Sequence, residues 1–159
     1  MRVGFGFDIH QFGADRALRL GGVEVPEGEG LVGYSDADCL LHAIADALLG
    51  AAGLGDIGQH FPDTDPAFRG ADSAELLGRV SSMVARAGYR VVNVDSTVVA
   101  EEPRLSPYRE AMRRRIAGVL GIPVDLIGVK FTTAEGLGAI GRVEGIACHA
   151  VCLIEKRGK

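Results

Sequence analysis

The sequence has few cysteines, no excess of basic residues and no long apolar run, and each shortage excludes a class of protein. Cys39, Cys148 and Cys152 form an odd set without a C-x-x-C pair, so we expect reduced, buried thiols in a cytoplasmic protein. Acidic side chains outnumber basic ones by 21 to 17, and the net charge of −4 argues against nucleic acid as a partner. No segment has the length of a membrane span or the pattern of a signal peptide.

The remaining composition is that of a globular protein with one core. Hydrophobic residues make up 47% of the 159 residues and charged residues 24%, which is ordinary for a folded domain. A chain of this length can bury a core without disulfide or metal staples. Because no linker, low-complexity segment or charge block interrupts the sequence, we expect a single domain over residues 1–159.

Hydrophobic periodicity and turn residues predict strands first and then alternating helices and strands. We expect a helix capped by Ser35 and a later one capped by Ser106, each followed by apolar residues at helical spacing. The expected elements are a strand over 2–9, a hairpin over 18–25, helices over 36–52, 72–87 and 107–120, strands over 91–100, 126–133 and 145–155, and a long loop over 53–70.

This order predicts an α+β fold, with one mixed sheet and helices packed on one of its faces. The strands over 91–100 and 145–154 carry apolar or small residues on both sides and lack a clean polar face. Helices that sit together cover only one face of such a sheet. The other face then needs a partner, so we expect an oligomer.

Asp8, His10 and His42 are candidate ligands of a divalent metal. Alternation along a strand places Asp8 and His10 on the same face, and His42 lies in the following helix. One carboxylate and two imidazoles suit Zn²⁺ with a fourth position open. Asp38 and Asp46 lie four residues to either side of His42, and either could orient its ring. The alternatives are a simple Asp8–His10 hydrogen bond and a solvated helix face.

Two G-x-G-x-x-G matches, at 53–58 and 136–141, do not indicate a dinucleotide site. The first follows a helix rather than a strand. The second follows a strand, but the residues after it look like another strand. The dinucleotide motif needs a strand, a turn and a helix in succession, so we reject both matches.

Two polar segments could bind phosphates, hydroxyls or a cation. The acidic stretch over 56–66 could bind polyol hydroxyls or a hydrated cation, although its residues are also typical of turns. Thr132, Thr133 and Glu135 follow a strand and could hold phosphate oxygens and Mg²⁺, or could simply form a turn. Arg142 and Glu144 follow and could form a surface ion pair.

Five segments, taken together, resemble one family over essentially the whole chain. The segments GFGFDIH, SDADCLLHAIADALLGAAGLGDIG, HFPDTDP, KFTTAEGLG and GRVEGIAC resemble the 2-C-methyl-D-erythritol 2,4-cyclodiphosphate synthases of the non-mevalonate isoprenoid pathway. The resemblance implies a phosphorus–oxygen lyase that acts on 4-diphosphocytidyl-2-C-methyl-D-erythritol 2-phosphate. Its 2-phosphate attacks the β-phosphorus, CMP leaves and a cyclic diphosphate forms. The resemblance also implies a homotrimer with active sites between subunits and sheets that face the three-fold axis.

The resemblance assigns roles to individual residues. Zinc, or another divalent transition metal, is assigned to Asp8, His10 and His42, and Mg²⁺ or Mn²⁺ to Glu135. Tyr34, Thr133 and Glu135 are implied to be catalytic. The implied substrate-binding residues are Asp8, His10, Tyr34, Ser35, Asp56, Ile57, Gly58, Phe61, Asp63, Asp65, Ala100, Arg104, Leu105, Ser106, Thr132, Thr133, Glu135 and Arg142.

Two positions depart from the family pattern and keep two other functions open. Tyr34 replaces a histidine that usually precedes the Ser-Asp pair, and Ala139 replaces an aromatic residue near the three-fold axis. In relatives the cavity on that axis can hold an isoprenoid diphosphate, and Arg142 and Glu144 are present here. One alternative is therefore a regulatory trimer that binds isoprenoid diphosphates. The other is a zinc-dependent phosphohydrolase of nucleotide diphosphates, which would need a base such as Asp38 or Asp46.

Overall fold

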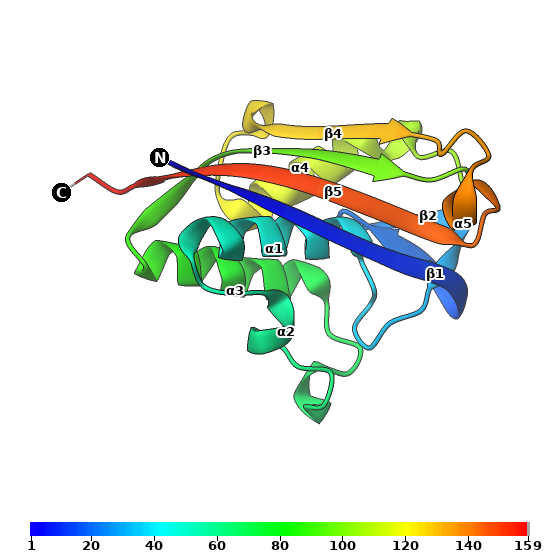
Figure 1. Ribbon diagram of the computed structural model, residues 1–159, viewed down its shortest axis with the longest axis horizontal. Helices are drawn as coiled ribbons and strands as arrows, with labels where there is room; N and C mark the ends of the chain where they lie inside the picture. Colours follow the sequence, from blue (N-terminus) through cyan, green and yellow to red (C-terminus); the bar gives the residue numbers. More distant parts are fainter. Residues whose placement is uncertain (159) are drawn as a thin grey trace.

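A computed structural model describes residues 1–158 and contains one five-stranded sheet in the order β2-β1-β5-β3-β4 (Figure 1). The strands are β1 (Arg2–Leu20), β2 (Val23–Leu31), β3 (Tyr89–Val99), β4 (Ile127–Thr132) and β5 (Gly145–Lys156). The helices are α1 (Cys39–Ala52), α2 (Ile57–His60), α3 (Ser73–Arg86), α4 (Arg109–Leu120) and α5 (Gly138–Gly141), with 3₁₀ turns η1 (Pro66–Phe68), η2 (Ser106–Tyr108) and η3 (Val124–Leu126). The expected α+β fold with a mixed sheet is confirmed.

The sheet is mixed because β4 alone runs parallel to its neighbour. The β1–β2, β1–β5 and β3–β5 pairs are antiparallel, while β3 and β4 are parallel. The chain turns from β1 into β2 at Gly21 and Gly22, whose φ angles of 61° and 72° favour glycine. The expected hairpin is therefore confirmed, and α4 provides the crossover that a parallel pair requires.

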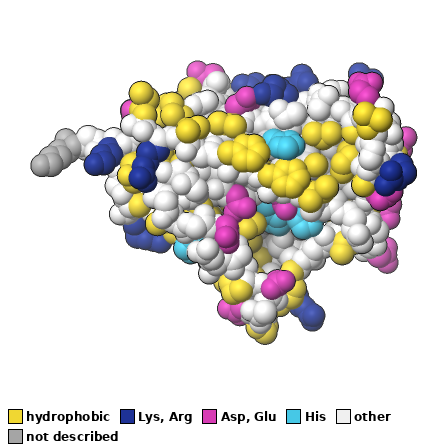
Figure 2. All heavy atoms as spheres, in the orientation of Figure 1, with side chains coloured by type: hydrophobic (Ala, Val, Ile, Leu, Met, Phe, Trp, Pro, Cys, Tyr) yellow, Lys and Arg dark blue, Asp and Glu magenta, His cyan; other side chains and the backbone are white. Residues whose placement is uncertain are grey.

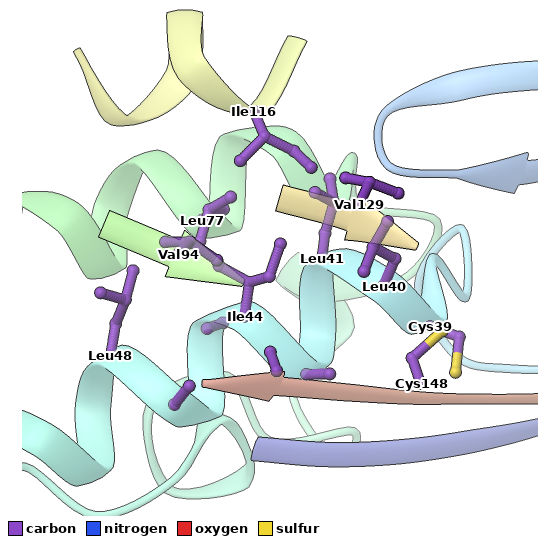
Figure 3. Close-up of a cluster of buried hydrophobic side chains, with 14 of the residues drawn as sticks. Cys39, Leu40, Leu41, Ile44, Leu48, Leu77, Val94, Ile116, Val129 and Cys148 are labelled. Atoms are coloured by element: carbon purple, nitrogen blue, oxygen red, sulfur yellow. The ribbon is translucent and has the colours of Figure 1, made fainter. Parts of the chain in front are cut away.

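Helices α1, α3 and α4 all pack on one face of the sheet, as expected (Figure 1). In the core, Ile44 and Leu48 of α1 lie near Leu77 of α3 and Val94 of β3, and all four side chains are fully buried (Figure 3). Helix α1 lies unusually close to β1. A Cβ atom at Gly6 would stand 1.9 Å from the carbonyl oxygen of Ala43, so only glycine permits this approach.

The opposite face of the sheet carries apolar side chains that no part of residues 1–158 covers. Alternate residues of β1 and one residue of β5 point outward there, and their exposed fractions lie between 45% and 68%. They are Val3, Phe5, Phe7, Ile9 and Val151. We call this set the open apolar face, and Figure 2 shows hydrophobic side chains gathered across this side of the molecule. The expected lack of a polar face is confirmed for β5 but was wrong for β3, whose Asp95 lies opposite Val151, is exposed and pairs with Lys130 of β4.

Three boundary predictions were wrong. Helix α1 begins at Cys39 and is capped by Asp38, because Ala37 adopts a left-handed φ of 56° that stops the helix from starting at Ser35. Ser106 does not cap a helix, because its hydroxyl accepts a hydrogen bond from Arg104 Nε (3.2 Å) and residues 106–108 form a 3₁₀ turn. The first strand continues well past residue 9, as far as Leu20.

The long loop predicted over 53–70 contains two short helical turns, α2 and η1. Asp56 caps α2 and Asp65 caps η1, so the acidic residues there do serve as turn formers. By contrast, the prediction of a helix over 72–87 is confirmed by α3, whose cap is Asp72. Among residues 1–158, no helix is long and apolar enough to cross a membrane.

Candidate metal-dependent active site

A pocket of about 600 Å³ opens between the middle of β1, the first turns of α1 and α3, and the loop that carries α2. The predicted site residues that line it are Asp8, His10, Tyr34, Ser35, His42, Ile57, Gly58, Phe61 and Asp63. Figure 2 shows histidine and acidic side chains close together near the middle of the view. The structure therefore brings nine of the nineteen predicted residues into a single cavity.

Asp8, His10 and His42 converge at this pocket, as the sequence predicts. Asp8 Oδ2 lies 2.9 Å from His10 Nε2 and 3.1 Å from His42 Nδ1. One ligand atom from each residue lies within 4.8 Å of the others, which is close enough to hold one ion. A carboxylate oxygen and two imidazole nitrogens, with the pocket on the remaining side, fit zinc or another divalent transition metal with an open position.

The cluster shifts the pKa values of its own members. Burial acts to raise the pKa of Asp8, but hydrogen bonds and charge from His10 and His42 outweigh it and hold that pKa well below its usual range. For His10, burial acts to lower the pKa, but the hydrogen bond and charge of Asp8 raise it overall. The carboxylate is thus kept ionised, which is the form that binds a metal.

Asp38 and Asp46 do not orient His42, so that prediction was wrong. Asp38 accepts from the backbone amides of Gly21, Gly22 and Leu41, because it is the buried cap of α1. Asp46 accepts from the amide of Ile57 at 2.8 Å and holds the start of α2. Burial raises the pKa of both carboxyls.

Other groups hold the two histidine rings instead. His10 Nδ1 lies 2.7 Å from the carbonyl oxygen of Val32. His42 Nε2 lies 2.9 Å from Ser73 Oγ and 3.2 Å from Ser35 Oγ. Each ring therefore has a hydrogen-bond partner on the side away from Asp8, as metal-binding histidines usually do.

The loop that carries Tyr34 and Ser35 is held by Arg16. The Arg16 guanidinium donates to the carbonyl oxygens of Leu31 (2.6 Å) and Ser35 (2.8 Å), and more weakly to that of Gly33 (3.5 Å). Neither Arg16 nor Ser73 is among the predicted site residues, because no sequence motif connects them with residues so distant along the chain.

Tyr34 is tied to the acidic loop that forms the other wall of the pocket. Its hydroxyl donates to the carbonyl oxygen of Asp65 (3.2 Å), and the Arg69 guanidinium lies 5.9 Å from its ring centre. The carboxylates of Asp56 and Asp65 accept from the amides of Gln59 and Ala67. Tyr34 thus links two segments that the sequence analysis treated separately.

Six of the other predicted residues line a second, smaller pocket of about 350 Å³ at the ends of β3 and β4, whereas Asp56, Asp65, Glu135 and Arg142 line neither pocket. The lining of the smaller pocket includes Ala100, Arg104, Leu105, Ser106, Thr132 and Thr133. Among residues 1–158, the lining of the first pocket includes none of residues 100–106 or 132–135. A single chain therefore presents the predicted site as two separate halves.

Glu135 lies beside this second pocket and has a strained backbone. Its φ is 53°, in the left-handed region that side chains rarely adopt. Glu101 Oε1 accepts from the amides on either side, those of Ala134 (2.9 Å) and Gly136 (3.1 Å). Thr133 Oγ1 accepts from the amide of Glu135 itself (3.2 Å). A single exposed carboxylate suits Mg²⁺, which takes its other ligands from water and phosphates.

Arg142 lines neither of these pockets. Its Nε donates to Glu144 Oε1 at 2.6 Å, which is the surface ion pair that the sequence analysis considered. The second glycine motif, at 136–141, lies between β4 and β5, where α5 is only four residues long. It does not have the context of a dinucleotide site.

Comparisons with known proteins agree on one family. The YgbB family model matches residues 1–155. A 2-C-methyl-D-erythritol 2,4-cyclodiphosphate synthase from Chlorobaculum parvum is 57% identical over 157 residues, which are 99% of this chain and 100% of the relative. A solved structure of such a synthase in a CDP-bound form is 37% identical, with a TM-score of 0.89 over 97% of this chain and 100% of the other.

A third comparison comes from a longer protein. The bifunctional IspDF of Campylobacter jejuni is 44% identical and has a TM-score of 0.95, with 98% of this chain covered. This chain covers only 42% of that bifunctional chain, so it matches one part of it. Fold, metal-site geometry and similarity agree along nearly the whole chain, and the protein belongs to the YgbB family.

Proposed function

We propose that this protein converts 4-diphosphocytidyl-2-C-methyl-D-erythritol 2-phosphate into 2-C-methyl-D-erythritol 2,4-cyclodiphosphate and CMP, as a step of isoprenoid precursor synthesis. The convergence of Asp8, His10 and His42 at the pocket carries this proposal. The curated relatives, which match over nearly their full length, are named for the formation of this cyclic product.

The reaction exchanges one phosphoanhydride bond for another. An oxygen of the 2-phosphate forms a bond to the β-phosphorus, and the bond from that phosphorus to the oxygen bridging the α-phosphorus breaks. The electron pair of that bond leaves with CMP. Because no water is consumed, the enzyme is a phosphorus–oxygen lyase. The attacking phosphate is already ionised, so the protein's main task is to position two anions in line.

The chain's residues divide this task between them. Asp8, His10 and His42 would hold zinc or another divalent transition metal, and Glu135 would hold Mg²⁺ or Mn²⁺. Bound there, the cations would supply positive charge that offsets the repulsion between the phosphates and the charge on the departing CMP. Ser35 and Thr133 would donate hydrogen bonds to phosphate oxygens.

The two pockets suit the two ends of the substrate. The acidic loop would hold the methylerythritol hydroxyls through Ile57, Gly58, Phe61 and Asp63, which line the larger pocket, and through the neighbouring Asp56. In the smaller pocket, residues 100–106 and Thr132 would hold the cytidine. The solved CDP-bound relative supports a cytidine nucleotide as part of the ligand. Tyr34 can donate a hydrogen bond but carries no positive charge at neutral pH, so its catalytic role would be weaker than that of histidine.

We also propose a homotrimer in which neighbouring copies complete each site. The larger and smaller pockets are separate in one chain, although the proposed substrate must contact both. The open apolar face is an extensive apolar surface of a kind that marks contact with another molecule. Packing of that face around a three-fold axis would bury it. An isoprenoid diphosphate in the central cavity, and the cytoplasmic location, stay predictions.

Neither alternative function is favoured by the site. A phosphohydrolase needs a base near the metal, but Asp38 and Asp46 accept hydrogen bonds from backbone amides elsewhere. A pure isoprenoid diphosphate sensor would not need the metal cluster at the larger pocket.

The His42→Ala variant tests the site. It should lose both bound zinc and CMP release, because only two ligands would remain. His60→Gln is the matched control, since His60 lies outside the cluster and contacts the carbonyl oxygen of Leu54, to which glutamine can also donate. Zinc at full occupancy in His42→Ala, measured by elemental analysis, would contradict the proposed ligand set.

A further inference from the structure

The His42 ring needs one particular tautomer in order to bind a metal through the atom that faces Asp8. Its Nδ1 faces Asp8 Oδ2, at 3.1 Å, and is the nitrogen directed toward the cluster. A neutral imidazole carries one N–H and one lone pair. If Nδ1 is to offer its lone pair, Nε2 must carry the hydrogen. Without a metal, the Asp8 carboxylate favours a hydrogen on Nδ1, so the groups around Nε2 must oppose Asp8 to prepare His42 as a ligand.

Ser73 can only accept a hydrogen bond from His42. Its hydroxyl donates to Asp36 Oδ1, because a carboxylate oxygen has no hydrogen to give. The lone pairs of Ser73 Oγ are then left for His42 Nε2, at 2.9 Å. Since the serine is only 1% exposed, water does not compete for these positions.

Asp36 is itself held in place by the backbone. Its Oδ2 accepts from the amide of Ser73 (3.1 Å), and its Oδ1 accepts from the amide of Asp38 (3.2 Å). The carboxylate therefore cannot turn away from the serine hydroxyl. Asp36 therefore fixes Ser73 as a donor to the carboxylate, and this in turn fixes Ser73 as an acceptor from the histidine ring.

We propose that Asp36 and Ser73 form a relay that selects the Nε2–H tautomer of His42 and turns the Nδ1 lone pair toward the metal position. Ser73 is thus a positioning residue that acts through His42. The proposal rests on the metal site proposed above and adds the hydrogen bonds that prepare His42 as one of its ligands. Mutation of a residue that hydrogen-bonds to a metal ligand typically lowers metal affinity by about 10- to 100-fold.

The same relay directs the hydroxyl of Ser35. This oxygen accepts from the amide of Ala37 (3.1 Å) and lies 3.2 Å from His42 Nε2. Because Nε2 already carries a hydrogen, it cannot accept the hydrogen of Ser35. That hydrogen remains available to the pocket, which Ser35 lines, where a phosphate oxygen would accept it.

The decisive variant is Ser73→Ala, studied without metal and with zinc. Long-range ¹H–¹⁵N spectra of histidine-labelled, metal-free protein report which ring nitrogen carries hydrogen. Wild-type His42 should carry a hydrogen on Nε2, whereas Ser73→Ala should shift toward the Nδ1–H form, which donates only to Asp8. Zinc affinity, measured by competition with a chelator, should fall by about 10- to 100-fold. Ser73→Thr, which retains a hydroxyl, should restore both properties in large part.

The matched control is Ser96→Ala. Ser96 is also a buried serine, at 2% exposure, but its hydroxyl donates to the carbonyl oxygen of Gly128, far from the cluster. This variant should keep both the tautomer and the zinc affinity of the wild type. An unchanged His42 tautomer in Ser73→Ala, or a zinc affinity equal to that of Ser96→Ala, would overturn the relay. If the wild type binds no zinc, the proposed function fails, and the tautomer in metal-free protein still decides the relay.

Discussion

Glu101 holds the turn that presents Glu135 and also lines the smaller pocket. Its carboxylate accepts from the amides of Ala134 and Gly136, on either side of the strained Glu135. A left-handed non-glycine residue costs about 1–3 kcal/mol and persists only where its surroundings hold it. The Glu101 carboxylate and the Thr133 hydroxyl together provide such a constraint.

We therefore expect Glu101→Ala to raise the Mg²⁺ concentration needed for half-maximal CMP release, by about 10-fold, because Glu135 would no longer be presented in one geometry. Glu101→Gln should stay close to the wild type, since its amide oxygen can accept the same two hydrogen bonds. A steady-state titration with Mg²⁺ measures the effect. Equal impairment of the two variants would show that the charge of Glu101 acts directly.

The three thiols should be unreactive in the folded protein. Burial raises the pKa of Cys152 to about 11 and raises that of Cys148 well above its usual value. Since the thiolate is the reactive form, a raised pKa leaves little of it at neutral pH. Reaction with a disulfide reagent should stay slow from pH 7 to 9 in native protein and become fast in urea. Rapid labelling of native protein at pH 8 would contradict the buried placement.

The contact between β1 and α1 positions the metal ligands, because Asp8 lies on the strand and His42 on the helix. Gly6 permits this contact, since a Cβ there would overlap the Ala43 carbonyl oxygen at 1.9 Å. In contrast, a Cβ at Gly118 of α4 would meet no atom within 4 Å. Close packing therefore requires glycine at position 6, whereas no packing contact requires it at position 118.

Gly6→Ala should destabilise the fold by about 1–3 kcal/mol or more, because α1 would have to move away from the sheet. Gly118→Ala should stabilise it by about 0.5–1 kcal/mol, because alanine is the better helix former. Urea denaturation followed by circular dichroism gives both values. A Gly6→Ala protein as stable as the wild type would contradict the close approach.

Periodicity predicted the long helices but not the short ones. Residues 73–86 repeat apolar side chains at helical spacing and begin after an aspartate, so local signals and the observed helix α3 agree. Helices α2 and α5 have four residues each, which is too short for a periodic pattern. The prediction that Ser35 caps α1 was wrong because Ala37, which follows it, has a left-handed backbone conformation. No local sequence signal indicates that conformation.

The candidate site was predictable to the extent that its residues lie in local motifs. Asp8 and His10 follow from strand alternation, and His42 from its place in the next helix. The resemblance contributed the residues of the smaller pocket. Arg16, Ser73 and Glu101 were not predictable, because each acts through a contact between segments distant in the sequence.

The proposed assembly predicts that shape and activity depend on the open apolar face. Phe7 lies on that face at 45% exposure and packs against His149, with ring centres 5.0 Å apart. The wild-type protein should sediment as a trimer. Phe7→Asp should sediment as one copy that keeps its circular dichroism spectrum, because a charge there opposes burial of the face.

Loss of the trimer should also abolish CMP release, since the two pockets would no longer meet across a subunit boundary. Val124→Asp is a useful control, because Val124 is a hydrophobic residue at 38% exposure in η3, outside the open apolar face. That variant should remain trimeric. A wild-type protein that sediments as a monomer and is nevertheless active would contradict the shared site.

The proposed cyclisation is tested most directly by ³¹P NMR of the purified protein with 4-diphosphocytidyl-2-C-methyl-D-erythritol 2-phosphate, Zn²⁺ and Mg²⁺. We expect two mutually coupled resonances of a cyclic diphosphate to appear together with CMP, and to be absent with His42→Ala. Linear phosphate products would instead indicate a hydrolase. Unchanged substrate, in protein that binds zinc, would contradict the cyclase activity.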